Sequence, residues 1–178
     1  MTTTVRQYFK DLSSFAKDVT SRGGCAEHSS SSQCSEFPLS AAIIKPMIIN
    51  SAHVMGGSSE PDGLRGFGRV HLGAGMPMDG VGETGLLVVE ATIRSDGEIT
   101  QLVTVDGDAR AELRATLAWL DPPKTALSAQ QLHHDLDPHV TGPRDAKYTM
   151  WKSGAGETVN VVERVIVPLN RWRAVCGA

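Results

Sequence analysis

The sequence predicts a mainly β fold, in which a C-terminal antiparallel β-sandwich follows a helical and glycine-rich segment. Short alternating or β-branched runs, separated by turn-forming residues, recur from Leu86 onward. Such runs without a helical period between them are typical of sandwiches. Upstream, an apolar stretch suits a buried helix, and a glycine-rich stretch follows it. We therefore expect two domains, over residues 1–78 and 79–178.

The helix expected over Phe37 to Ala52 is apolar on every side, because seven of its residues are Ala41, Ala42, Ile43, Ile44, Met47, Ile48 and Ile49. A helix of this kind has to be buried all round. Residues 1–66 show no strand-like alternation that could form a covering sheet, so its packing partners are expected in a part of the domain missing from this chain. Pro46 predicts that the helix either starts near this residue or is kinked there.

A glycine-rich connector extends from Gly56 to Gly85 and predicts turns and a crossing segment rather than regular structure. The Gly66-Phe67-Gly68 pattern resembles a phosphate-binding loop only weakly. It lacks the flanking strand, the third glycine and the following helix that such loops need.

The predicted strands lie between turn formers such as Asp96-Gly97 and Pro122-Pro123. In the clearest strand, Leu113 to Trp119, alternate residues are apolar, which predicts one face in the core and one in water. Asp121 is interpreted as a turn residue that bonds its own backbone. The runs that predict strands are Leu86–Ile93, Ile99–Val105, Ala111–Trp119, Leu132–Val140, Ala146–Trp151, Val159–Val167 and Arg171–Cys176.

Composition limits the class of function. The chain has 178 residues and a formal charge of -3 at pH 7, with both signs spread along it, so nothing predicts a nucleic acid or an anionic membrane as partner. No apolar run approaches the ~18 residues that span a bilayer, and no signal peptide pattern opens the chain. Cys25 and Cys34 could close a disulfide or remain free thiols with Cys176.

The stretch from His133 to His139 is the only cluster with ligand chemistry. If it is extended, a period of two places His133, Asp135, Asp137 and His139 on one face, a set that zinc or a similar ion could accept. The carboxylates of Asp135 and Asp137, with carbonyls and waters, would instead suit calcium. A third interpretation is purely structural, with the aspartates capping turns and the histidines in solvent.

The tryptophans and isolated histidines favour structural roles. Three tryptophans could form a sugar-binding platform, but their apolar neighbours favour packing in or near the core: Trp119, Trp151 and Trp172. His53 and His71 have no nucleophile context, because no G-x-S-x-G pattern is present. In the Val159 to Val167 run, the adjacent Glu163 and Arg164 are expected on opposite faces of a strand.

Several short blocks, in this order and at these separations, resemble the C-terminal end of a subtilisin-like serine protease that carries a C-terminal sandwich. The blocks are VRQYF at 5–9, IIKPMIINSA at 43–52, GFGRVHL at 66–72, TLAWLDPP at 116–123 and DLD at 135–137. The resemblance implies that residues 1–78 are the remnant of an α/β subtilase catalytic domain and that residues 79–178 form a jelly-roll-like sandwich. Lys45-Pro46 and Pro138 depart from the family pattern.

The resemblance implies serine endopeptidase activity for the parent protein, but the chemistry lies outside this chain. The family keeps its Asp, His and Ser triad upstream of these blocks, and no G-T-S-M turn precedes Val5, so no catalytic residue is assigned here. It further implies an upstream protease domain as partner, protein substrates acting through that domain, a secreted or membrane-associated parent, and Ca²⁺ near Asp135 and Asp137. The alternatives are a stand-alone sandwich that binds protein or glycan, and a metalloenzyme built on the 133–139 cluster.

Overall fold

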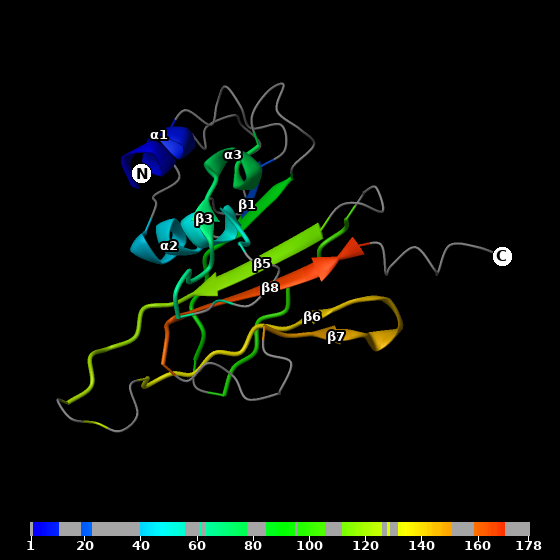
Figure 1. The fold of residues 1–178 in the computed structure, drawn as a ribbon. Coiled ribbons are helices and arrows are strands. Elements are labelled where there is room, and N and C mark those ends of the chain that lie inside the picture. Colours follow the sequence, from blue (N-terminus) through cyan, green and yellow to red (C-terminus); the bar gives the residue numbers. More distant parts are fainter. Residues whose placement is uncertain are drawn as a thin grey trace, which may run out of the picture. The chain divides into compact units, whose positions relative to one another are not determined.

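A computed structural model describes residues 2–10, 19–22, 40–55, 61, 63–77, 85–94, 96–105, 112–125, 128, 132–150 and 159–169. These residues form a mixed fold of short helices and small two-stranded sheets (Figure 1), three of which are antiparallel. The chain divides into a first unit, residues 1–53 and 69–102, and a second unit, residues 54–68 and 103–178. The mainly β expectation therefore holds only loosely.

The first unit contains three helices and two small sheets. Its elements are α1 (Thr2–Lys10), β1 (Val19–Arg22), α2 (Ala41–Asn50), β2 (Ala52–His53), β3 (Arg69–Val70), α3 (Leu72–Gly75) and β4 (Leu86–Val89). The β2 and β3 strands pair antiparallel, whereas β1 and β4 pair in parallel. Residues 1–66 thus contribute β1 and β2, although they show no strand-like alternation. The antiparallel sandwich role expected for the Leu86 run is wrong, because β4 pairs in parallel with β1. The expectation that the packing partners of the 37–52 helix are missing from this chain is also wrong for Ile43 and Met47, which pack within the first unit.

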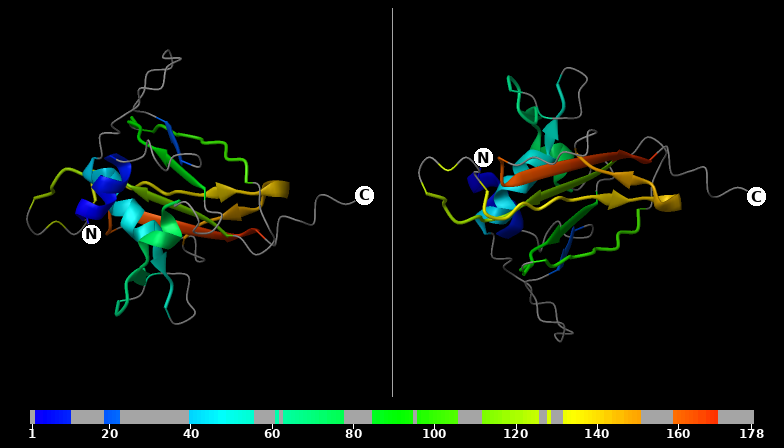
Figure 2. Two further views of the ribbon diagram at one scale, coloured as in Figure 1. Left: turned by 90° about the horizontal axis from the view of Figure 1, so that it is seen from above. Right: turned by 90° about the horizontal axis from the view of Figure 1, so that it is seen from below.

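The core of the first unit joins its helices to β4. It consists of Val5, Phe9, Ile43, Met47, Met76, Leu86 and Val88, flanked by Tyr8, Ile48 and Leu72. Figure 2 shows α1 and α2, blue and cyan, side by side. Helix α2 continues through Pro46, so the expectation that it starts there is wrong. Its burial is one-sided, since Ile43, Ile44 and Met47 are buried while Lys45 is exposed.

Tyr8 connects α1 to the residues after α3. Its hydroxyl donates a 2.7 Å hydrogen bond to the carbonyl oxygen of Pro77, and burial raises the pKa of the phenol. Because the pKa is higher in the folded than in the unfolded state, Tyr8 makes its full contribution to the free energy of unfolding below pH ~10. This contribution is lost as pH rises through the pKa of the folded state. Tyr8→Phe should cost about 1 kcal/mol near neutral pH. Urea unfolding of both proteins should show this difference shrinking in alkali, and a constant difference would contradict it.

Gly75 in α3 lies against the fully buried Ser51, whose hydroxyl donates to the carbonyl oxygen of Ile48 at 2.8 Å. A Cβ at Gly75 would stand 2.7 Å from the Cβ and 2.8 Å from the Cα of Ser51. Gly75→Ala should therefore lower the free energy of unfolding by about 1–3 kcal/mol in thermal or urea melts. Gly85→Ala is the matched control in the same unit, because nothing lies within 4 Å of its added methyl group. Equal stability of the two variants would contradict the close approach.

The second unit is built on one long antiparallel pair. Its elements are β5 (Glu112–Ala118), β6 (Val140–Thr141), a 3₁₀ turn η2 (Pro143–Asp145), β7 (Lys147–Tyr148) and β8 (Val162–Pro168). Strand β5 pairs with β8 from Glu112↔Pro168 to Ala118↔Val162, and β6 pairs with β7 (Figure 1). The strands expected at 111–119 and 159–167 are confirmed to within a few residues. Within the described residues 99–105 no strand forms, and 171–176 lies outside the described residues.

Both faces of β8 are buried. Glu163 and Arg164 lie on opposite faces, as the sequence predicts, and each is only 2% exposed. On the Glu163 face, Val165 and Val167 are 1% and 0% exposed. On the Arg164 side, Phe67 covers the guanidinium. The division into one core face and one water face was predicted for Leu113 to Trp119, and it is wrong for β5, because residues 113–118 are all half-buried.

Candidate functional site

Several hydrogen bonds meet in a polar site at the end of β5. Strand β5 stops at Ala118, and the Trp119 N–H continues the ladder by donating to the carbonyl oxygen of Val161 at 3.3 Å. Pro122 and Pro123 have no N–H to donate, so the ladder ends here. The chain turns away after Asp121, and we call Trp119, Asp121, His133 and His134 the Asp121 corner.

The Asp121 carboxylate holds two consecutive residues of a distant segment. Its Oδ2 accepts the backbone N–H of His133 at 2.6 Å, and its Oδ1 accepts the backbone N–H of His134 at 3.1 Å. The same Oδ1 lies 2.7 Å from the Nδ1 atom of the His134 ring. The sequence interpretation of Asp121 as a turn residue bonded to its own backbone was therefore incomplete. Its partners His133 and His134 lie 12 and 13 residues further along the chain.

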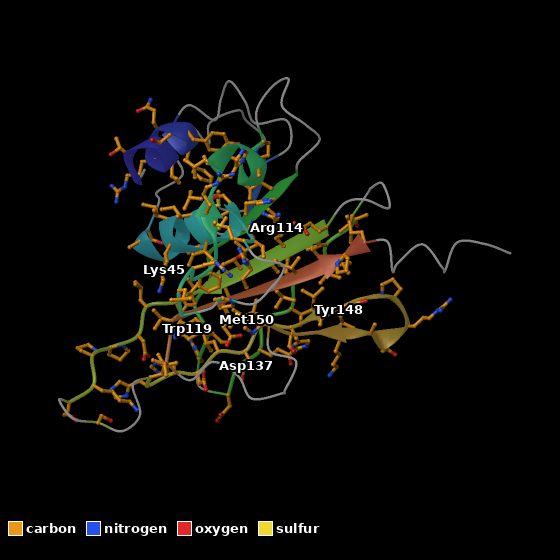
Figure 3. All side chains as sticks on the ribbon, in the orientation of Figure 1. Lys45, Arg114, Trp119, Asp137, Tyr148 and Met150 are labelled. Atoms are coloured by element: carbon orange, nitrogen blue, oxygen red, sulfur yellow. The ribbon has the colours of Figure 1, made fainter. Side chains whose placement is uncertain are left out.

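Trp119 is a buried residue of the Asp121 corner and is bonded to it through its indole ring. Its indole Nε1–H donates to the carbonyl oxygen of His134 at 3.0 Å, and the residue is only 9% exposed. Figure 3 shows Trp119 beside the end of β5. A buried tryptophan usually finds a partner for its N–H. This burial confirms the packing role predicted for Trp119, whereas Trp151 and Trp172 lie outside the described residues.

The corner keeps Asp121 ionised. Desolvation opposes ionisation, but the backbone bond from His133, the ring and backbone bonds from His134 and the charge of His134 outweigh it. Together these hold the pKa of Asp121 below its usual value. The side chain of Asp121 is 5% exposed and that of His134 is 60% exposed. The corner therefore presents an imidazole to solvent on a buried carboxylate.

The predicted metal face follows directly from the corner. Asp135, Asp137 and His139 are exposed and alternate with half-buried residues, as the extended period predicts. His133 and His134, in contrast, lie in a bend. Among the described residues, no three His, Cys, Asp or Glu side chains come together as a metal site. The structure thus places Asp135 and Asp137 on one exposed side and does not gather them with His133 and His139 into one such cluster.

Arg164 forms the second polar feature of this unit. Its guanidinium carbon lies 5.2 Å from the centre of the Phe67 ring, and Nη2 donates to the Phe67 carbonyl oxygen at 3.2 Å. Its backbone N–H faces the sulfur of Met150 at 3.3 Å. Burial lowers the pKa of Arg164, the charge of Arg114 lowers it further, and Glu112, which pairs with Arg114, raises it.

The backbone conformation on either side of Phe67 explains why glycine occupies positions 66 and 68. Gly66 and Gly68 have φ values of 55° and 105°, a region that favours glycine. The Gly68 N–H donates to the carbonyl oxygen of Arg65 at 3.1 Å, which closes a turn. The Gly-x-Gly pattern thus delivers the Phe67 ring to Arg164. This role was not recognised from the sequence, although Gly-aromatic-Gly is a signal that could suggest it.

The remaining sequence candidates add no further site. His53 and His71 are exposed on the β2 strand and after β3. Cys25, Cys34 and Cys176 lie outside the described residues, so the disulfide considered between Cys25 and Cys34 stays a prediction. No helix in the described part of the chain is long and apolar enough to cross a membrane. Comparison with models of protein families, with curated proteins and with solved structures finds no match for this chain.

Proposed function

We propose that this chain is the C-terminal portion of a subtilisin-like serine endopeptidase, in which it stabilises the protease domain and contributes no catalytic residue. The observation that carries the proposal is the Asp121 corner. Asp121 belongs to the TLAWLDPP block and binds the backbone of His133 and His134, directly before the DLD block. The TLAWLDPP block is thus hydrogen-bonded to the two residues that directly precede the DLD block, which supports treating the two blocks as neighbours in one structural unit.

The first unit supports the proposal in the same way. Val5 and Phe9 from the VRQYF block share a core with Ile43 and Met47 from the IIKPMIINSA block. We further propose that residues 1–78 end a catalytic domain and that 79–178 form a jelly-roll-like sandwich around the β5–β8 pair. On this proposal the parent protein is secreted or membrane-associated, and its protease domain is the principal partner.

The test is made on the native protein, captured with an antibody raised against residues 112–169. Its intact mass and N-terminal sequence are determined, and it is treated with a fluorophosphonate, which labels an activated serine. A species much larger than 19.0 kDa that is labelled upstream of these blocks is the expected result. A native chain that begins at Met1 and remains unlabelled would overturn the proposal.

Calcium at Asp135 and Asp137 stays a prediction of the resemblance. Both side chains are exposed, but two carboxylates supply at most four of the roughly 6–8 oxygens that Ca²⁺ takes. Carbonyl groups and waters would have to supply the others. A rise in Tm with added CaCl₂ that is absent in Asp135→Asn and Asp137→Asn would support the site, and equal Tm values would remove it.

A stand-alone module that binds protein or glycan is the second candidate. The second unit exposes two large apolar side chains that flank the β5–β8 ladder in sequence, Leu120 just after β5 and Val159 just before β8, at 75% and 57%. Exposed apolar side chains of this kind are common at binding surfaces. The unlabelled native chain described above would favour this candidate.

A further inference from the structure

The Asp121 corner presents two histidine rings to solvent in an unusual way. In an extended strand, consecutive side chains point to opposite faces. His133 and His134 lie in a bend instead, and their ring centres are only 6.3 Å apart, with both residues exposed. The bend is held by the Asp121 carboxylate and by the Trp119 indole, which together bind both backbone N–H groups and the His134 carbonyl oxygen.

The Asp121 carboxylate also orients the His134 ring. A carboxylate is only an acceptor, so the ring nitrogen 2.7 Å from Oδ1, Nδ1, carries the proton. In the neutral ring the lone pair is then on Nε2, which lies on the far side of the ring from Asp121. A carboxylate that fixes the tautomer of a histidine is the usual support of a metal-binding imidazole.

We propose that His133 and His134 form a surface site for a divalent transition-metal ion, with Asp121 as its positioning residue. Nitrogen–metal bonds of about 2.0–2.1 Å place the centres of two rings on one ion roughly 6 Å apart or less. The observed 6.3 Å is closed by a small rotation of exposed rings. Water completes the coordination, and imidazole ligands select nickel, copper or zinc over calcium.

This site differs from the set of alternating residues predicted from the sequence. It uses His134, which that set leaves out, and it needs neither Asp137 nor His139. It is also independent of the proposed protease function, because it depends only on contacts within the second unit.

The test follows Ni²⁺ binding to the full chain by NMR and calorimetry. Substoichiometric Ni²⁺, which is paramagnetic, should broaden the amide signals of Asp121, His133 and His134 first. His133→Gln and His134→Gln should each weaken binding by about tenfold or more, and Asp121→Asn by about tenfold, with unchanged circular dichroism. His71→Gln, which removes an exposed histidine elsewhere, is the matched control and should bind as the parent chain does.

Two results would overturn the proposal. The first is broadening that begins at other residues or that persists unchanged in His134→Gln. The second is calorimetry that shows the same affinity for the parent chain and for the double variant His133→Gln/His134→Gln. If Asp121→Asn alters the fold, the two histidine variants still decide the outcome, because both side chains are exposed.

Discussion

Replacing Phe67 with alanine should lower the free energy of unfolding of the second unit by roughly 2–4 kcal/mol. The Phe67 ring lies 5.2 Å from the guanidinium carbon of Arg164, which is only 2% exposed. A desolvated cation over an aromatic face gains about 2 kcal/mol, and truncation of the ring adds the loss of apolar contact. Urea unfolding followed by circular dichroism measures the change.

Two further variants separate the causes of this loss. Phe67→Leu keeps an apolar side chain but removes the aromatic face, so its cost should fall between those of the parent chain and Phe67→Ala. Arg164→Met should cost less than Phe67→Ala, because an apolar residue of similar length replaces the buried charge instead of leaving it uncovered. In the double variant Phe67→Ala/Arg164→Met, the loss of unfolding free energy should differ by about 1–2 kcal/mol from the sum of the two single losses. Additive effects would show that ring and guanidinium do not interact.

The elements that the sequence predicts best are those with a local cause. Alternating and β-branched residues at 111–119 and 159–167 predicted two strands, and β5 and β8 lie at 112–118 and 162–168. The side-chain period of two is a property of the strand itself, so it survives in the sequence. In the same way, Asp96 and Gly97 predicted a turn, and the Gly97 N–H donates to the Arg94 carbonyl oxygen at 2.9 Å.

Pairings between distant segments were not predicted. Strand β1 has four residues and acquires a partner only in β4, where Val19 pairs with Leu86. Nothing within four residues specifies a partner so far along the chain. The burial of Arg164 has a similar origin, because Phe67 comes from a segment almost a hundred residues upstream. Sequence periodicity places a residue on a face but does not tell what covers that face.

The Asp121 corner was predicted only in part. The sequence identified Asp121 as a turn residue, and it identified the 133–139 stretch as the cluster with ligand chemistry. It predicted a strand over Leu132–Val140, but His133 and His134 lie in a bend, residues 135–139 belong to no strand, and β6 begins only at Val140. The bend depends on the hydrogen bonds that Asp121 accepts from two backbone N–H groups 12 and 13 residues further along. These contacts are a tertiary property, so the pairing of His133 with His134 could not be predicted from spacing.

Asp121→Ala should release the segment that follows Leu132 from the end of β5. The substitution removes the acceptor of two backbone N–H groups and the partner of the His134 ring at once. We expect the amide protons of His133 and His134 to exchange with solvent about tenfold faster or more, because their protection depends on these bonds. The emission of Trp119 should also change, since its indole donor is bonded to the His134 carbonyl oxygen.

Asp121→Asn and Asp137→Ala complete this experiment. Asparagine keeps one acceptor oxygen but turns an N–H donor toward a backbone N–H, so its exchange rates should lie between those of the parent chain and Asp121→Ala. Asp137→Ala removes an exposed carboxylate three and four residues after the same histidines and should leave their exchange unchanged. Unchanged exchange at His133 and His134 in Asp121→Ala would mean that the bend forms without the carboxylate. The corner would then be a consequence of the burial of Leu132, which is 5% exposed, and not of the polar contacts.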